Sequence, residues 1–343
     1  MSSVSSFSMA HVMRGSLQRL RADLDRAQLE AGSGRAADPG LALGHGVQRS
    51  INLRNGLTQN DAYIDGGRLI VARLEASQTT LAGAADVVNV LRNDSIVAMG
   101  GGDVSGLIAS ARVGLSRVVE ALNTQAGGQY LFSGVDVRQP PIQSDAQAVS
   151  KAAIAQAFTT TFGVAPGSPA AAAITPAAMQ GFLDTQFAAL FQPSQWAATW
   201  AQSSSTAQTA EVAPGERLTV SATAHEDGVR AMAQGLSMLA DLNIDALNPE
   251  TRRVTLDAAA RVLGGANGAI TEIQARLGTV QREATSAIDH LDAQNNLTQT
   301  QIGALENVDP AEVAARLSLL TTQLETSYAL TSRMNKMNLL NYL

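Results

Sequence analysis

Apolar residues recur at spacings of three and four near both ends of the chain, and this periodicity constrains the fold more than any other feature. The residues of the two stripes are Met13, Leu17, Leu20, Leu24, Val313, Leu317, Leu320, Leu324, Tyr328 and Met334. Heptad-like spacing places such side chains along one face of a helix, and another helix must cover that face. The sequence therefore predicts two long terminal helices that pair with each other, and it marks these residues as a candidate assembly interface.

A second helical pattern covers residues 40–97, and a matching pattern begins at Ile270. The apolar seam positions are Ile64, Val71, Leu74, Leu81, Ala85, Val88, Ile273, Leu277, Val280, Ala284 and Leu291. Gly67 and Gln78 fall on the first seam, at positions where an apolar side chain is expected. A continuous helix of about 50 residues would be about 75 Å long, which is typical of a rod rather than of a globular enzyme.

Three pairs of residues mark helix starts, because an Asp or Asn cap followed by proline suits the first turn of a helix. They are Asp38-Pro39, Asn248-Pro249 and Asp309-Pro310. The third pair is followed by Glu312, which completes a capping-box pattern. Glycines at 32, 34 and 100–102 predict breaks between helices.

Residues 136–225 differ from both ends of the chain, since they contain most of the prolines, long Ala/Thr/Ser tracts and both tryptophans. Residues 179–191 predict a short helix, and alternation over residues 216–222 predicts a strand after the Pro214-Gly215 turn. The predicted fold is mainly α with an α+β insert, in which long heptad-patterned N- and C-terminal helices pair as a rod. We expect residues 1–39 and 306–343 to form a terminal coiled-coil layer, 40–135 and 226–305 a helical rod domain, and 136–225 a smaller, irregular insert.

The composition argues against several classes of function. The formal net charge is −6, whereas nucleic-acid binding needs a concentrated basic surface. The chain has no cysteine, and its four histidines lie far apart without metal-ligand spacing. No apolar run is long enough to span a membrane. We therefore expect no nucleic-acid partner, no membrane insertion, no metal, no cofactor and no catalytic residue.

Several segments of the chain resemble conserved segments of the flagellin superfamily. They are residues 29–40 (LEAGSGRAADPG), 60–67 (NDAYIDGG), 128–134 (GQYLFSG), 306–312 (ENVDPAE) and 339–343 (LLNYL). Within the superfamily, the last three are similar to the hook-associated branch, and the final two to the hook–filament junction proteins (hook-associated protein 3). The resemblance covers residues 1–135 and 226–343 and leaves the middle of the chain unassigned.

The resemblance implies a structural component of the bacterial flagellum that connects the hook to the filament. Members of this branch form a homo-oligomeric ring between the first hook-associated protein and flagellin, and they are secreted to the extracellular flagellum by type III export. A disordered N-terminus guides that export, and the polar residues 1–10 are compatible with such a signal. The resemblance further implies that the terminal helices are disordered before assembly, that a cytoplasmic export chaperone covers the last helix, and that the insert 136–225 faces outward.

Two alternatives stay open at the level of the sequence. The chain could be a flagellin, the filament subunit itself, which polymerises without limit. Residues 136–225 could instead form an enzyme or ligand-binding module in which Trp196 and Trp200, four residues apart, stack on a sugar. Paired tryptophans more often pack a small core than bind a ligand.

Overall fold

The computed structural model describes the backbone of residues 2–340 and the side chains of residues 11–333. The chain divides into two compact units, residues 1–62 with 291–343 and residues 63–290. The α-helices are α1 (Ser2–Ser33), α2 (Pro39–Leu43), α3 (Val47–Met99), α4 (Val104–Leu122), α5 (Ala146–Phe162), α6 (Pro176–Phe182), α7 (Pro193–Thr199), α8 (Asp227–Asp241), α9 (Pro249–Glu306) and α10 (Pro310–Leu340). The shorter helical turns are η1 (Gly44–Gly46), η2 (Pro169–Ala173), η3 (Leu183–Phe187) and η4 (Ile244–Ala246), and the strands are β1 (Gln125–Ala126), β2 (Gln129–Tyr130), β3 (Thr209–Ala213) and β4 (Glu216–Thr219). The predicted class, mainly α with small β elements in the middle, is confirmed.

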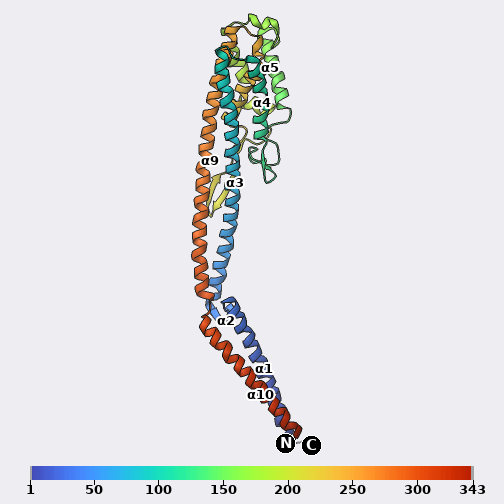
Figure 1. Cartoon of the computed structure of the whole chain (residues 1–343), viewed down its shortest axis with the longest axis vertical. Helices are drawn as coiled ribbons and strands as arrows, with labels where there is room; N and C mark the ends of the chain where they lie inside the picture. The colour runs from blue at the N-terminus through green and yellow to red at the C-terminus, as the bar shows by residue number, and fades with distance from the viewer. Residues whose placement is uncertain (1, 341–343) are drawn as a thin grey trace. The chain divides into compact units, whose positions relative to one another are not determined.

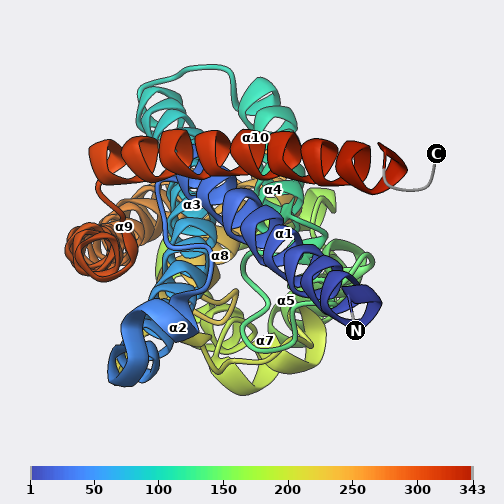
Figure 2. The ribbon, with the colours of Figure 1, turned by 90° about the horizontal axis from the view of Figure 1, so that it is seen from below.

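The first unit is built around the pair of terminal helices. α1 and α10 pack against each other (Figure 1) and run at an angle to each other when seen from below (Figure 2). Asp38 caps α2 by accepting a hydrogen bond from the Leu41 amide, and Asp309 caps α10 by accepting one from the Ala311 amide. Both proline-marked starts are therefore confirmed, although Glu312 bonds to Arg316 instead of returning to the cap as a capping box requires.

The start of α3 and the end of α9 also belong to this unit, and they meet through polar side chains. The buried Asn295 amide accepts a hydrogen bond from Asn60 at 3.0 Å and donates one to the Asp61 carboxylate at 2.7 Å. A satisfied polar pair inside a helix interface disfavours sliding of one helix along the other, because a shifted register would leave these groups unpaired.

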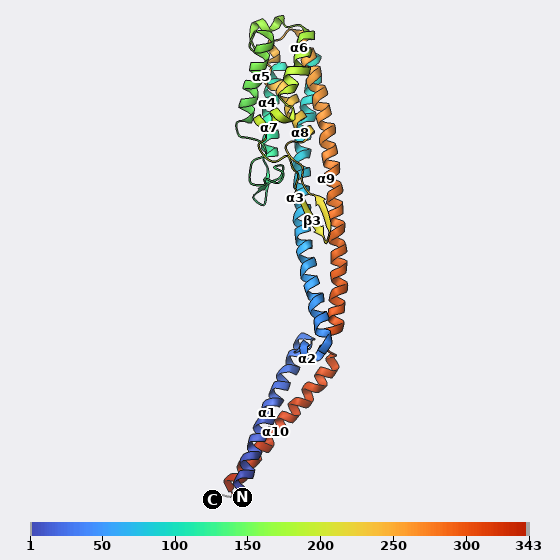
Figure 3. The same ribbon diagram turned by 180° about the vertical axis from the view of Figure 1, so that it is seen from behind.

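In the second unit, α3 and α9 run side by side in opposite directions (Figures 1 and 3). The predicted seam residues Leu74, Leu81 and Val88 are fully buried. Gly67 interrupts the seam because a Cβ there would come within 2.9 Å of the Ile288 side chain. Gln78 interrupts it because its side chain donates a hydrogen bond to Gln281 of α9. The two residues that break the apolar pattern are thus the places where α9 approaches closely or pairs through a polar contact.

The core of the second unit contains an aromatic cluster from the middle of the chain. Its members are Phe158, Phe162, Phe182, Phe187, Phe191, Trp196 and Trp200. The two tryptophan rings stack at 5.1 Å, both are buried, and the Trp196 indole donates to the Ala224 carbonyl. These tryptophans therefore pack a core. The cluster is continuous with the buried faces of α4, α8 and α9, so residues 136–225 share one core with the helices that flank them.

Two small antiparallel hairpins complete the second unit. β1 and β2 turn at Gly127 and Gly128, which both have positive φ as a tight two-residue hairpin requires. Arg73 of α3 donates to Gln129 at 2.9 Å, and burial lowers the pKa of its guanidinium. β3 and β4 lie beside α3 and α9 (Figure 3), where Val212 is buried and packs in a cluster with Ala284.

Several boundaries differ from those expected from the sequence. The long N-terminal helix begins at Val47 rather than at residue 40, because Gly44 adopts a positive φ that ends α2, and the short turn η1 then leads into α3. The short helix predicted over residues 179–191 begins earlier, at Pro176, and continues from α6 through the wider turn η3 to residue 189. Residues 2–10 are helical, whereas the resemblance implies disorder there.

Candidate assembly surface of the terminal helices

The predicted stripe residues lie mostly between α1 and α10. Met13, Leu17, Leu20 and Leu24 of α1 are half-buried, as are Leu317, Leu320 and Leu324 of α10. Val313 is fully buried, and Tyr328 remains 41% exposed. The side chain of Met334 and residues 341–343 of the terminal motif lie outside the described part of the chain. The structure thus brings the two stripes together. Most of the stripe residues nevertheless stay partly exposed to solvent after the two helices have paired.

The outer faces of the same two helices carry additional uncovered leucines. Leu29 of α1 is 64% exposed, and Leu319 and Leu330 of α10 are 58% and 49% exposed. At 100° per residue, Leu319 and Leu330 point away from the Leu317–Leu324 stripe. Single exposed leucines are ordinary on a protein surface. Here they occur on a helix pair whose contact residues are only half-buried, and such a surface is suited to contact further protein.

Polar contacts fix how the two helices pair. The Arg21 guanidinium of α1 donates to the Tyr328 hydroxyl at 2.9 Å and lies 5.6 Å from the centre of its ring. Arg316 of α10 pairs with Glu30 of α1 at 3.2 Å. These contacts favour one register of α10 against α1.

The two linkers that lead to the terminal helices are hydrogen-bonded to each other. Arg35 and Asn307 form an isolated antiparallel bridge. The Ala36 amide donates to the Glu306 carbonyl at 2.9 Å, and the Val308 amide donates to the Gly34 carbonyl at 3.1 Å. We call residues 34–38 and 307–309 together the joint.

One buried carboxylate lies directly beside the joint. Glu306 ends α9, is only 3% exposed, and accepts hydrogen bonds from Ser50 and Arg54 of α3. The bonds from Arg54 and then Ser50 hold the pKa of the Glu306 carboxyl below its usual range. Because this folded-state pKa is lowered, the stabilisation is fully present above the ordinary carboxyl pKa and is lost as pH falls through the lowered value.

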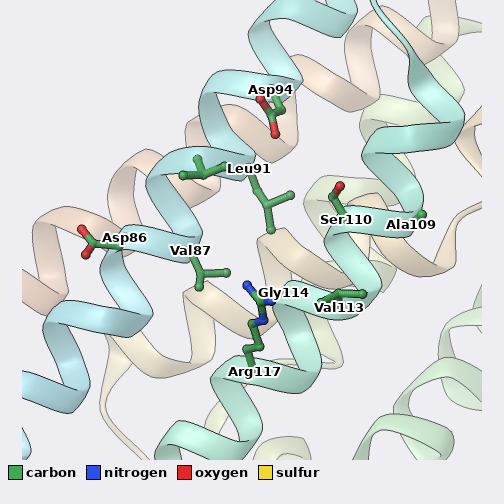
Figure 4. Close-up of a pocket in the computed structure, with 10 residues that line it drawn as sticks. Asp86, Val87, Leu91, Asp94, Ala109, Ser110, Val113, Gly114 and Arg117 are labelled. Atoms are coloured by element: carbon green, nitrogen blue, oxygen red, sulfur yellow. The ribbon is translucent and has the colours of Figure 1, made fainter.

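A groove in the second unit is a further candidate for contact with protein (Figure 4). Its volume is about 530 Å³, and it is lined by Asp86, Val87, Val90, Leu91, Asp94, Ala109, Ser110, Val113, Gly114 and Arg117 of α3 and α4. The two helices approach closely because Gly114 has no side chain; a Cβ there would lie 2.6 Å from Leu91. The lining is mostly apolar and also contains Asp86, Asp94 and Arg117, which suits contact with an apolar side chain.

Other sites are not supported by the described residues. Among the side chains of residues 11–333, no group of three or more His, Asp or Glu could hold a metal ion. His225, for example, faces the Ser203 carbonyl at 2.8 Å. The described helices include none with the length and apolar character needed to cross a membrane.

Comparison with known families bears directly on the paired terminal helices. The family described as the bacterial flagellin N-terminal helical region matches residues 4–136, and the bacterial flagellin C-terminal helical region matches residues 261–343. The chain belongs to the flagellin superfamily. As in the resemblance noted from the sequence, the two matches include α1, α3, α4, most of α9 and α10, and leave residues 137–260 unmatched.

Two solved structures align with the chain at low sequence identity. A structure of a putative flagellar hook-associated protein from Vibrio parahaemolyticus aligns with a TM-score of 0.50 and 11% identity, covering 75% of this chain and 95% of that one. Bacillus cereus FlgL aligns with a TM-score of 0.39 and 12% identity over 77% of this chain and all of that one. No curated protein matches the chain. As a flagellin-superfamily member, the protein is a structural component of the bacterial flagellum.

Replacing Leu324 by aspartate should weaken the terminal pair without unfolding the second unit. A carboxylate at this half-buried position would lose hydration against α1, at a cost of about 1–3 kcal/mol to pairing. Near-ultraviolet circular dichroism of the stacked Trp196 and Trp200 reports on the second unit, and swimming motility reports on assembly. Thr322→Asp, which adds the same charge at an exposed position of α10, is the control. Equal loss of the tryptophan signal and of motility would contradict the assignment of Leu324 to an assembly surface.

Proposed function

We propose that this protein is the junction subunit that connects the flagellar hook to the flagellin filament. The observation that carries the assembly role is the terminal pair, whose apolar stripes are half-covered and whose outer faces expose Leu29, Leu319 and Leu330. The resemblance of residues 128–134, 306–312 and 339–343 to the hook-associated branch favours the junction over the filament.

In this proposal the subunits form a homo-oligomeric ring outside the cell. One face of the ring contacts the first hook-associated protein, and the other contacts flagellin. The terminal helices provide the inner coiled-coil layer, residues 40–135 and 226–305 the next layer, and residues 136–225 face outward. The chain is exported through the type III apparatus, and an export chaperone covers the last helix beforehand. Burial of the exposed leucines between subunits supplies about 25 cal/mol per Å² of apolar area.

The alternative function is that of a flagellin. Flagellins share the terminal helices and their exposed apolar residues, so these features do not discriminate between a filament subunit and a junction subunit. The shared core of residues 136–225 with α4, α8 and α9 leaves the sugar-binding alternative without support from the tryptophans, because both rings are buried.

Polymerisation of the purified chain separates the two functions. We expect the protein alone to remain in small assemblies under conditions in which flagellin elongates, and to promote growth of filament when flagellin is added. Light scattering and electron microscopy follow both reactions. Long filaments formed by this chain alone would identify it as a flagellin and would contradict the junction proposal.

A further inference from the structure

The groove between α3 and α4 is bordered by apolar side chains that stay exposed. Val90 of α3 and Val113 of α4 line the groove and are 58% and 53% exposed. Val97, which is 65% exposed, lies two helical turns beyond Val90 and extends the apolar surface along α3. Exposed valines beside an apolar groove favour contact with an apolar surface from outside the unit.

Three charged residues that line the groove have no partner among the described side chains. Asp86 and Asp94 belong to α3 and Arg117 to α4, and Asp94 and Arg117 lie toward opposite ends of the groove (Figure 4). Arg230 of the same unit, by contrast, donates to the Phe191 carbonyl and pairs with Asp227. An apolar groove with unpaired charges of both signs is suited to bind a helix that carries one apolar stripe and charges of both signs.

Helix α5 carries an exposed surface of this kind. Asp145, Val149, Ala152 and Gln156 follow one another at spacings of three and four, so they lie along one face of the helix, and all four are exposed. Asp145 stands at the N-cap position, but its side chain makes no capping hydrogen bond. Lys151, at the edge of this face, is also exposed. The face is narrow and apolar, with an unpaired carboxylate at its start.

The groove and α5 lie on different sides of α4. Gly114 and Arg117 belong to the groove that α4 shares with α3, whereas Leu115 and Ser116 line a cavity that α4 shares with α5. Ser116 donates to Gln147 of α5 at 3.3 Å. At 100° per residue, the two pairs lie on opposite sides of α4, which runs between α3 and α5 in Figure 1. Helix α5 therefore cannot fill the groove of its own chain.

We propose that the groove binds helix α5 of a second copy of this chain, with Val149 against Val90 and Val113. The inference deepens the proposed function, because it names a contact between neighbouring subunits of the ring. The surface that binds differs from the surface that is bound, so the contact is head-to-tail and can repeat around a ring. Helix α5 lies outside both family matches, so the contact distinguishes copies of this chain from flagellin.

The charges of the two surfaces complement each other in one orientation of α5. Asp145 and Lys151 are separated by about 9 Å along the helix axis. With Asp145 beside Arg117, Lys151 is directed toward the end of the groove that Asp94 lines. The reverse orientation would place Asp145 beside Asp94, and like charges at an interface are unfavourable.

Disulfide cross-linking in assembled flagella tests the contact. The chain has no cysteine, so an introduced pair reports only on the two chosen surfaces. A chain with Val113→Cys and Val149→Cys replaces the wild type, the flagella are isolated and oxidised, and an antibody detects this chain after electrophoresis without reductant. The matched control combines Val149→Cys with Thr271→Cys, an exposed residue of α9 that does not line the groove.

We expect the Val113–Val149 pair to give a ladder of dimers and larger multimers, because each subunit shares one disulfide with each of two neighbours. Each single cysteine variant and the control pair should stay at the size of the monomer. The absence of multimers from the test pair, or an equal ladder from the control pair, would overturn the inference. Dimers from Val113→Cys alone would also overturn it, because they would show that two grooves face each other.

Charge reversal provides a second test that does not depend on cysteine. Arg117→Glu and Asp145→Arg each place like charges at the contact, and each should lower the amount of this chain in isolated flagella by about threefold or more. The double variant restores opposite charges and should return to within about twofold of the wild type. Near-ultraviolet circular dichroism of Trp196 and Trp200 confirms that each variant is folded. No loss in the single variants, or no recovery in the double variant, would contradict the contact.

The contact and the junction function can fail separately. Both tests report on neighbouring copies of this chain within the flagellum, whether the chain is a junction subunit or a filament subunit. Polymerisation of the purified chain, described above, distinguishes those two functions without reference to α5. Loss of the ladder together with normal growth of filament on added flagellin would overturn the contact and leave the junction proposal standing.

Discussion

A chain that ends after Glu312, and so lacks residues 313–343, should be exported but should leave its host unable to swim. The deletion removes Val313, which is buried in the terminal pair, and the three half-buried leucines of the α10 stripe. It leaves α4, α8 and the aromatic cluster intact, because these belong to the other compact unit. We expect near-ultraviolet circular dichroism to retain the signal of the stacked tryptophans while motility falls to the level of a null strain.

The controls for this truncation separate assembly from export and folding. The truncated chain must be detected in the culture medium, because loss of export would also abolish motility. A full-length chain carrying Thr322→Ala, an exposed change on α10, should swim normally. A motile strain with the truncated, exported chain would show that α10 is dispensable for assembly.

Deleting Gln78 and Thr79 from α3 should abolish both folding of the second unit and motility. Removal of two residues rotates the following part of the helix by about 200°, which turns Leu81, Ala85 and Val88 away from the core they fill. It also removes the Gln78–Gln281 bond and displaces Asn89 from Asn267, to which it donates at 3.3 Å. Thermal unfolding followed by circular dichroism should show no cooperative transition for the second unit.

Thr79→Ala is the control for the deletion, because Thr79 is exposed and the substitution keeps the register of α3. It should change the midpoint of thermal unfolding by no more than about 2 °C. A cooperative transition near that of the wild type in the deletion variant would mean that the α3–α9 register is not specified by these contacts.

The sequence predicted the long helices well because their signals are local. The seam of Leu74, Leu81 and Val88 and the Asp-Pro caps depend on residues within a few turns of each other. The terminal stripes were also predicted, since their spacing alone places them on one face. Gly67 and Gln78 looked like defects of the pattern only because their partners, Ile288 and Gln281, lie far along the chain.

Features that depend on distant partners could not be predicted in the same way. Glu306 lies 252 residues from Arg54, and Glu30 lies 286 residues from Arg316, so no spacing rule connects these charges.

Helix α5 was not predicted because its run of Ala and Thr is also typical of irregular segments. The aromatic residues around Phe158 and Trp196 share one core with the flanking helices. For that reason we expect residues 136–225 to be harder to replace than their composition suggests.

Electron microscopy of flagella from a strain that lacks only this protein tests the central proposal most directly. If the protein is the junction subunit, the cells should carry hooks without filaments, flagellin should accumulate in the medium, and a plasmid copy of the gene should restore filaments. Normal filaments on the deletion strain would contradict the junction function. Hooks without filaments and without flagellin in the medium would identify this chain as the filament subunit instead.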